Sequence, residues 1–146
     1  MPHKQRRRYF PASGDNNMDW DFRQIVHIVE NVVAFIKTKE VLRDPKDRRK
    51  ILLGLLSGDN EIWISVTKKH RKRFPAVRIL IHEAMHILYP RFVRERDLDQ
   101  KEAILYKRFT EEQRAFLRNH IPKRTSVKEP EDKELTYYPK GLPFAL

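Results

Sequence analysis

Residues 81–90 read Ile-His-Glu-Ala-Met-His-Ile-Leu-Tyr-Pro, and they lie inside a segment with the pattern of a helix. Pro75 suits the first turn of a helix, where its missing N–H costs no hydrogen bond, and Pro90 is expected to end the helix. No Gly or Pro interrupts the segment between these two prolines, and Ile and Leu are frequent in it. We therefore predict a buried helix between Pro75 and Pro90.

Three side chains of this helix suggest a metal site. His82 and His86 are four residues apart, so both imidazoles project from one face and can bind one metal ion. Glu83 points in a neighbouring direction, where its carboxylate can take a proton from metal-bound water that Zn²⁺ has acidified to a pKa of about 7. Burying two His and one Glu among Ile and Leu is costly unless they share a task. The pattern predicts a zinc-dependent peptidase with Glu83 as the catalytic residue.

A catalytic zinc needs a third protein ligand and an open position for water. Because the chain has no cysteine, that ligand must be a His or a carboxylate. The first candidate is Glu102, at the start of a further predicted helix that would return past the two His side chains. The small residue Ala103 beside it would let the two helices approach closely. The alternatives are Glu95, Asp97, Asp99, Glu111 and Glu112.

The His-Glu-x-x-His motif at 82–86, together with the Glu-Ala pair at 102–103, resembles the gluzincin metallopeptidases, in particular the minigluzincins and the ImmA/IrrE-type proteases. The resemblance spans residues 61–120. It implies an α+β fold: a small zincin-like domain, mostly helical, with a short sheet beside the motif helix. It also implies Zn²⁺ bound by His82, His86 and Glu102, and a peptide or protein substrate. In these families a strand before the motif helix forms the upper rim of the cleft, where an extended peptide can pair, and residues 61–66 resemble that strand.

Two helices are expected before the motif. Apolar residues recur at helical spacing from Trp20 to about Leu42, with Asp19 or Asp21 as the cap. A shorter helix is predicted over residues 46–56, and turn residues follow it.

One strand and one helical region complete the predicted elements. Residues 61–66 combine β-branched and aromatic side chains with partial alternation, which indicates a strand. A helical region over residues 100–119 is expected to break near Thr110, where Thr110 and Gln113 match a capping pattern.

The chain has 146 residues, which suits one domain with a core and two tails. We predict a basic flexible arm over residues 1–17, the zincin-like domain over 18–122 and a C-terminal tail over 123–146. No apolar run approaches the length of a membrane helix, and no apolar segment follows the basic N-terminus as in a signal peptide. A cytoplasmic protein without membrane contact is the expectation.

The net charge of +11 favours contact with nucleic acid, anionic membrane surfaces or acidic proteins. Two basic runs are candidates for phosphate contacts, and a solvated charged surface is the alternative. The residues are Arg6, Arg7, Arg8, Lys68, Lys69, Arg71, Lys72 and Arg73. The chain could therefore also be a basic nucleic-acid-binding or regulatory module whose metal site is structural or vestigial.

Two further predictions concern the cleft. A peptidase needs a group that stabilises the oxyanion, and Tyr106 and His120 are candidates, with a purely structural role as the alternative. The last residues, 142–146, are apolar after a polar stretch. They would either pack on the domain as a strap or lie in the cleft and inhibit the enzyme.

Overall fold

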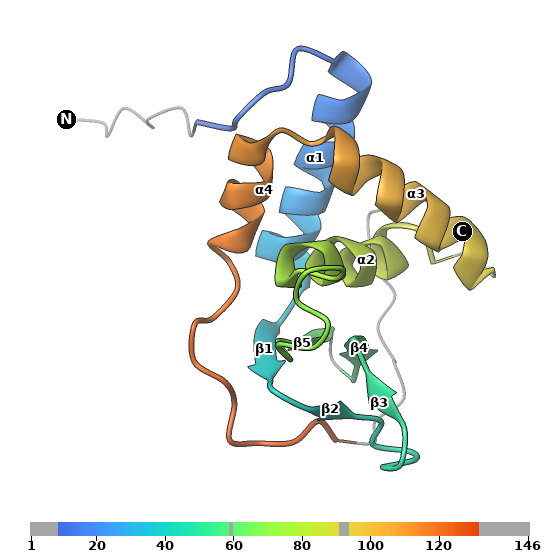
Figure 1. The fold of residues 1–146 in the computed structure, drawn as a ribbon. Helices are drawn as coiled ribbons and strands as arrows, with labels where there is room; N and C mark the ends of the chain where they lie inside the picture. The colour runs from blue at the N-terminus through green and yellow to red at the C-terminus, as the bar shows by residue number, and fades with distance from the viewer. Residues whose placement is uncertain (1–8, 59, 91–93, 132–146) are drawn as a thin grey trace.

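The structure is a computed structural model that describes residues 9–58, 60–90 and 94–131. These residues form an α+β domain with four α-helices and a small mixed sheet, which confirms the predicted fold class (Figure 1). The elements in chain order are α1 (Asn16–His27), a π-helix (Ile28–Val32), β1 (Phe35–Lys39), β2 (Leu42–Arg43), β3 (Ile51–Leu52), β4 (Gly54–Ser57), β5 (Glu61–Ser65), α2 (Ala76–Leu88), α3 (Glu95–Arg108) and α4 (Glu111–Arg118).

The main sheet has three strands in the order β1-β5-β4. Its central strand, β5, is the strand predicted at 61–66, and it pairs with β1 in parallel and with β4 in antiparallel. Ile62 and Ile64 on one face of β5 belong to the hydrophobic core, and Trp63 on the other face is also buried. β2 and β3 form a separate antiparallel pair.

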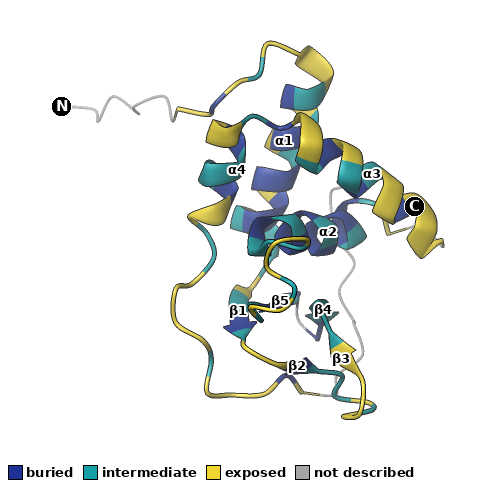
Figure 2. Cartoon of the chain, viewed as in Figure 1, coloured by how far each residue is buried: buried dark blue, intermediate teal, exposed yellow. Residues whose placement is uncertain are grey.

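Helix α2 is the centre of the molecule. It lies between the sheet and the other helices, and nearly all of it is buried, whereas α3 and α4 each expose an outer face (Figures 1 and 2). Leu80, Ile81 and Met85 have no exposed surface. The helix begins directly after Pro75 and ends before Pro90, as the sequence predicts. None of the helices in the described part of the chain is long and apolar enough to cross a membrane.

The predicted helix over residues 20–42 is wrong in its second half. The helical segment ends at Val32, and β1 begins at Phe35. Residues 32–36 are β-branched or aromatic except for Ala34, and such side chains favour strands. Over so short an apolar run, the spacing of the side chains fits a helix and a strand equally well. The parallel pairing with β5 stabilises the strand.

The cap of α1 also differs from the prediction. The carboxylate of Asp15, rather than that of Asp19 or Asp21, accepts hydrogen bonds from two N–H groups of the first turn. Asp19 instead accepts hydrogen bonds from Ser13, at 2.7 Å from its hydroxyl, and from Gln113, at 2.9 Å. This buried network fastens the segment before α1 to the domain.

The predicted helix over residues 46–56 is wrong. The chain there forms the turn that joins β2 to β3, then β3 itself and most of β4. Gly54 weakens a helix by about 1 kcal/mol relative to Ala, and pairing with β5 supplies hydrogen bonds that a short helix would have to make alone. Gly58 and Asn60 take positive φ angles of 50° and 62° in the turn that joins β4 to β5.

The helical region after the motif is confirmed, with an earlier start. The expected break lies between α3 and α4, and Thr110 and Gln113 form a reciprocal capping box. α3 begins at Glu95, five residues before the predicted start at residue 100. Glu95 and Asp97 in its first turn interact favourably with the positive end of the helix dipole.

The described part of the C-terminal tail follows the outer edge of β1. The N–H of Ser126 donates to the carbonyl of Thr38 at 2.8 Å, and the Thr38 hydroxyl donates to the carbonyl of Arg124 at 3.2 Å. Lys39 forms an ion pair with Glu129 at 3.0 Å. The predicted position of residues 142–146 lies outside the described residues.

Candidate metal centre

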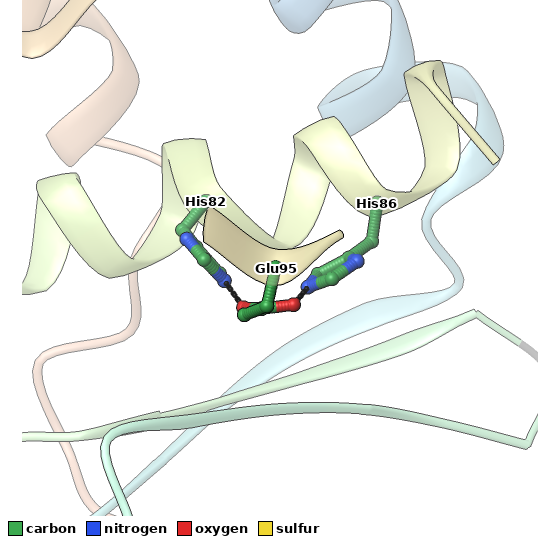
Figure 3. A group of neighbouring side chains, drawn as sticks. All are labelled: His82, His86 and Glu95. Atoms are coloured by element: carbon green, nitrogen blue, oxygen red, sulfur yellow. Dashed lines mark hydrogen bonds and ion pairs between the residues drawn. The ribbon is translucent and has the colours of Figure 1, made fainter. Parts of the chain in front are cut away.

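The two motif histidines project from the same face of α2 toward the same space (Figure 3). The ring centroids of His82 and His86 are 4.9 Å apart, and the rings are nearly perpendicular. Both side chains are partly buried, with exposed fractions of 16% and 32%. The α-helix produces this arrangement because residues four apart lie one above the other on its surface.

A carboxylate from α3 meets the two imidazoles. One oxygen of Glu95 lies 2.7 Å from Nε2 of His82, and the other lies 3.5 Å from Nε2 of His86 (Figure 3). One ligand atom from each of the three residues lies within 4.8 Å of the others. Neighbouring ligands of a tetrahedral zinc, with bonds of about 2.0–2.2 Å, lie on the order of 3.4 Å apart, so this donor set fits Zn²⁺. Other transition metals accept the same donors.

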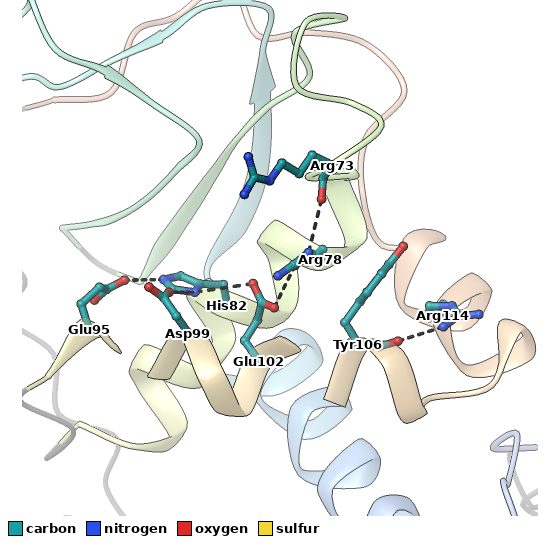
Figure 4. Close-up of polar contacts among 8 residues, drawn as sticks. All are labelled: Arg73, Arg78, His82, Glu95, Asp99, Glu102, Tyr106 and Arg114. Carbon is teal, nitrogen blue, oxygen red and sulfur yellow. Dashed lines mark hydrogen bonds and ion pairs between the residues drawn. The ribbon is translucent and has the colours of Figure 1, made fainter. Parts of the chain in front are cut away.

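Glu102, the predicted third ligand, lies on the other side of His82 (Figure 4). Its Oε1 is 3.8 Å from Nδ1 of His82, and its Oε2 accepts a hydrogen bond from Nε of Arg78 at 2.9 Å. Asp99 lies nearer, with its Oδ1 3.3 Å from the same Nδ1. A carboxylate beside the outer nitrogen of a ligating histidine fixes the orientation of its ring. The geometry therefore favours Glu95, one of the alternatives, as the third ligand, and gives Asp99 and Glu102 an orienting position.

Glu83 lies in the same cleft as His82 and Glu95 and is buried, with an exposed fraction of 6%. Burial raises the pKa of Glu83 to about 8, and the negative charge of Glu95 adds to this rise. A carboxyl with such a pKa can both accept and release a proton near neutral pH, which general acid–base catalysis requires.

Burial shifts the pKa of two neighbouring groups as well. It lowers the pKa of His86, an effect that the charge of Glu95 opposes. The neutral imidazole, the form that binds metals, is thereby favoured. Burial raises the pKa of Glu102, and the Arg78 guanidinium opposes this shift.

His82, Glu83, Glu95 and Glu102 line a cleft of about 490 Å³ between α2, α3 and the β3–β4 segment. Gly54 lets the β4 backbone approach α2 closely: a Cβ built there would lie 2.8 Å from Oε1 of Glu83 and 2.6 Å from Cγ2 of Ile79. The lining residues are Ile51, Leu52, Leu53, Gly54, Phe74, Arg78, Ile79, His82, Glu83, Glu95, Asp99 and Glu102.

The strand beside the cleft is β4, and the prediction that residues 61–66 form the rim strand is wrong. β5 pairs with a strand on each side and so offers no free edge to a peptide. β4 pairs with β5 on one side, where the carbonyl of Leu53 accepts from the N–H of Ser65. Because hydrogen-bonded and outward-facing residues alternate along an antiparallel strand, the main-chain groups of Gly54 and Leu56 face the opposite edge.

The structure does not bring the two predicted oxyanion stabilisers into this cleft. His120 contacts Glu30, with Nε2 2.7 Å from its carboxylate, and lines a different hollow beside the π-helix. The ring of Tyr106 lies between the guanidinium groups of Arg78 and Arg114, at 5.7 and 5.3 Å, and is not part of the cleft lining. Both residues pack between helices, which explains their presence without a catalytic role.

The second basic run lies in turns between β5 and α2, and its lysine and arginine side chains are exposed. They are Lys68, Lys69, Arg71, Lys72 and Arg73. The first run, Arg6 to Arg8, lies outside the described residues.

Glu95 is the candidate ligand that the geometry favours and that the sequence places only among the alternatives to Glu102. Its signal was the spacing of Glu95, Asp99 and Glu102, which places three carboxylates on one face of a helix that starts at residue 95. Comparisons with protein-family models, with curated proteins and with solved structures find no match for this chain. The resemblance to gluzincins therefore stays a prediction from the motif.

Proposed function

We propose that this protein is a cytoplasmic zinc-dependent peptidase of the gluzincin type. The observation that carries the proposal is the convergence of His82, His86 and Glu95 on one point, with Glu83 buried in the cleft that His82 and Glu95 line. A structural site would need the donors alone. A hydrolytic site also needs a general base beside the metal position, and the buried carboxyl of Glu83 supplies one.

A zinc ion bound by the three residues would lower the pKa of a water molecule to about 7 and polarise the scissile carbonyl. Glu83 takes the proton from the attacking water and returns it to the leaving amine. Its burial keeps competing water away from this proton, and the contact with Gly54 holds its carboxylate against the β4 backbone. Asp99 and Glu102 fix the ring of His82.

The outward main-chain groups of Gly54 and Leu56 support a peptide or unfolded protein segment as the substrate. An extended peptide can add to this edge as a further strand and reach the cleft that Gly54 lines. The apolar side chains of Ile51 and Leu52 at the same cleft favour substrates with an apolar residue next to the bond that is cut.

The test compares the full-length protein with Glu83→Gln, each loaded with one equivalent of zinc, on unfolded casein and on a mixed peptide library read by mass spectrometry. Gln keeps the shape of the side chain but cannot take the proton, so hydrolysis is expected to fall by about 10²–10⁴-fold while zinc binding persists. Removing zinc with a chelator should abolish hydrolysis, and adding zinc back should restore it.

Hydrolysis that survives in the Glu83→Gln variant would show that Glu83 is not the base. A wild-type protein that binds zinc but cleaves nothing would favour the second candidate function, a basic binding module with a structural metal site.

A further inference from the structure

A second hollow lies at the amino end of α2, next to Pro75. It has a volume of about 600 Å³ and is bounded by the ends of β1 and β5, the basic turns before α2 and the segment that follows α4. Its lining residues are Thr38, Ser65, Val66, Arg71, Phe74, Pro75, Ala76, Val77, Arg118, Asn119, Ile121, Pro122 and Lys123. We call it the basic cavity.

Three cationic side chains line this cavity, one from the turns before α2 and two from the end of α4 and the segment after it, and no described lining residue is acidic. The guanidinium of Arg71 donates one hydrogen bond to the carbonyl of Val66 at 3.3 Å, which positions the group and leaves its other N–H donors. Arg118 contacts Glu111 at 3.4 Å, and both side chains are at least half exposed, so the pair is weak. Lys123 is exposed at the mouth.

The floor of the cavity adds to the positive potential. Ala76 and Val77, the first residues of the 13-residue helix α2, line it. The N-cap, Pro75, supplies no side-chain hydrogen bond, so no side chain caps the first N–H groups of α2. These uncapped N–H groups and the positive end of the helix dipole attract anions to the cavity that the three cations line.

We propose that the basic cavity binds phosphate groups of a nucleic acid backbone. The exposed cations of residues 68–73 continue from Arg71 at its rim, so the positive surface extends beyond one phosphate and suits a repeating anion. A membrane surface fits less well, because the large exposed hydrophobic side chains found among the described residues all lie outside the cavity and these turns. Phosphate binding at this cavity needs no metal ion, so its test does not depend on whether the protein is a peptidase.

The experiment measures binding of the full-length protein to a fluorescein-labelled DNA duplex of about two helical turns, by anisotropy, between about 50 and 200 mM salt. The first variant is Arg71→Gln/Arg118→Gln/Lys123→Gln. It is expected to bind at least about tenfold more weakly and to reduce the salt slope by about 2.7, since each lost phosphate contact removes about 0.9. The matched control, Arg23→Gln/Lys107→Gln/Arg108→Gln, removes the same charge from exposed helical positions and should change binding far less.

A second variant guards against a folding defect. Ala76→Glu places a carboxylate at the start of α2, where it favours the helix but repels a phosphate from the cavity. A folded Ala76→Glu protein that binds DNA as weakly as the first variant would support the site. If the control variant loses as much DNA affinity as the first variant, binding depends on net charge alone and the proposal is overturned. Failure of the wild type to bind the duplex would also overturn it, as would binding only to inorganic phosphate or to phosphatidylserine vesicles.

Discussion

The metal cleft and the basic cavity are both built on α2 and both include Phe74, yet their charges are opposite. Four carboxylates and one arginine line the cleft, whereas three cations and no described carboxylate line the cavity. The elements packed on each part of α2 decide the sign of the charge. Three of the four carboxylates come from α3, whereas the cations come from the turns before α2, from α4 and from the segment after α4. The amino end of α2 attracts anions through its free N–H groups, and the middle of the helix presents the two histidines that a cation requires.

This contrast shows that the net charge of the chain does not predict the local charge at each site. The chain carries a formal charge of +11, and that number predicts an affinity for polyanions. It does not reveal that the catalytic candidates lie in an acidic hollow that would attract cations. The following predictions test whether the two sites differ as their lining indicates, beginning with the largest expected effect.

Zinc affinity should separate the ligands from their neighbours. Glu95→Ala removes a donor and is expected to weaken zinc binding by more than about 100-fold, whereas Glu102→Ala should cost about 10- to 100-fold because Glu102 only orients His82. Asp97→Ala, an exposed carboxylate on the same helix, is the matched control. Titration against a chromophoric chelator measures all three. A larger loss in Glu102→Ala than in Glu95→Ala would return Glu102 to the ligand set.

The stability of the metal-free protein should fall as pH rises, because of Glu83. Its pKa is about 8 in the folded protein against an ordinary value of 4.5, so the folded state holds this proton more tightly. The contribution is present below pH 4.5 and is lost progressively up to about pH 8, at about 1.4 kcal/mol per pH unit. Denaturant unfolding with EDTA should show a shallower pH dependence in Glu83→Gln. Parallel pH profiles would contradict the prediction.

Gly54→Ala should damage the cleft and spare the basic cavity. The added methyl would lie 2.6 Å from Cγ2 of Ile79 and 2.8 Å from the Glu83 carboxylate. Overpacking of this kind costs about 1–3 kcal/mol in the free energy of unfolding, and displacement of Glu83 should lower hydrolysis. Combining the change with Ile79→Ala relieves one of these contacts. If the two costs simply add, the clash is not the cause.

The smallest effect concerns the charge preference at the amino end of α2. Ala76→Glu should stabilise the metal-free protein by about 0.3–1 kcal/mol, and Ala76→Lys should destabilise it by a similar amount, because of the helix dipole and the nearby cations. Thermal unfolding at low salt measures both, and high salt should reduce the difference. An equal response to both substitutions would show that the cavity is not electrostatically polarised.

The sequence predicts the part of the site that one helix determines. His82, Glu83 and His86 follow from a local spacing, and the prolines on either side define the helix that holds them. The partner from α3 does not follow in this way. Glu95 reaches the histidines only because α3 starts five residues before the predicted region, in a polar stretch whose helical state depends on packing against α2.

The errors in the fold have the same origin. Residues 51–56 carry a Leu-rich pattern that suits a short helix, but β5 provides a partner that makes Gly54 to Ser57 a strand. Residues 32–36 are likewise predicted to be helical, and β1 forms there because it pairs with β5. Pairing between distant strands cannot be seen in a local pattern, and in this chain it also creates the edge beside the cleft.

The pairing of residues 124–126 with the outer edge of β1 also has a consequence for self-association. An open sheet edge can template strands from other molecules and so promote aggregation. At Thr38 the outer edge of β1 already has a partner from its own chain, so within the described residues the open edge of the three-stranded sheet is that of β4. A strand from another molecule that pairs with this edge would lie beside the cleft that Gly54 and Glu83 line. If the proposed peptidase function holds, the edge of the main sheet that is open to aggregation is therefore also its substrate-binding edge.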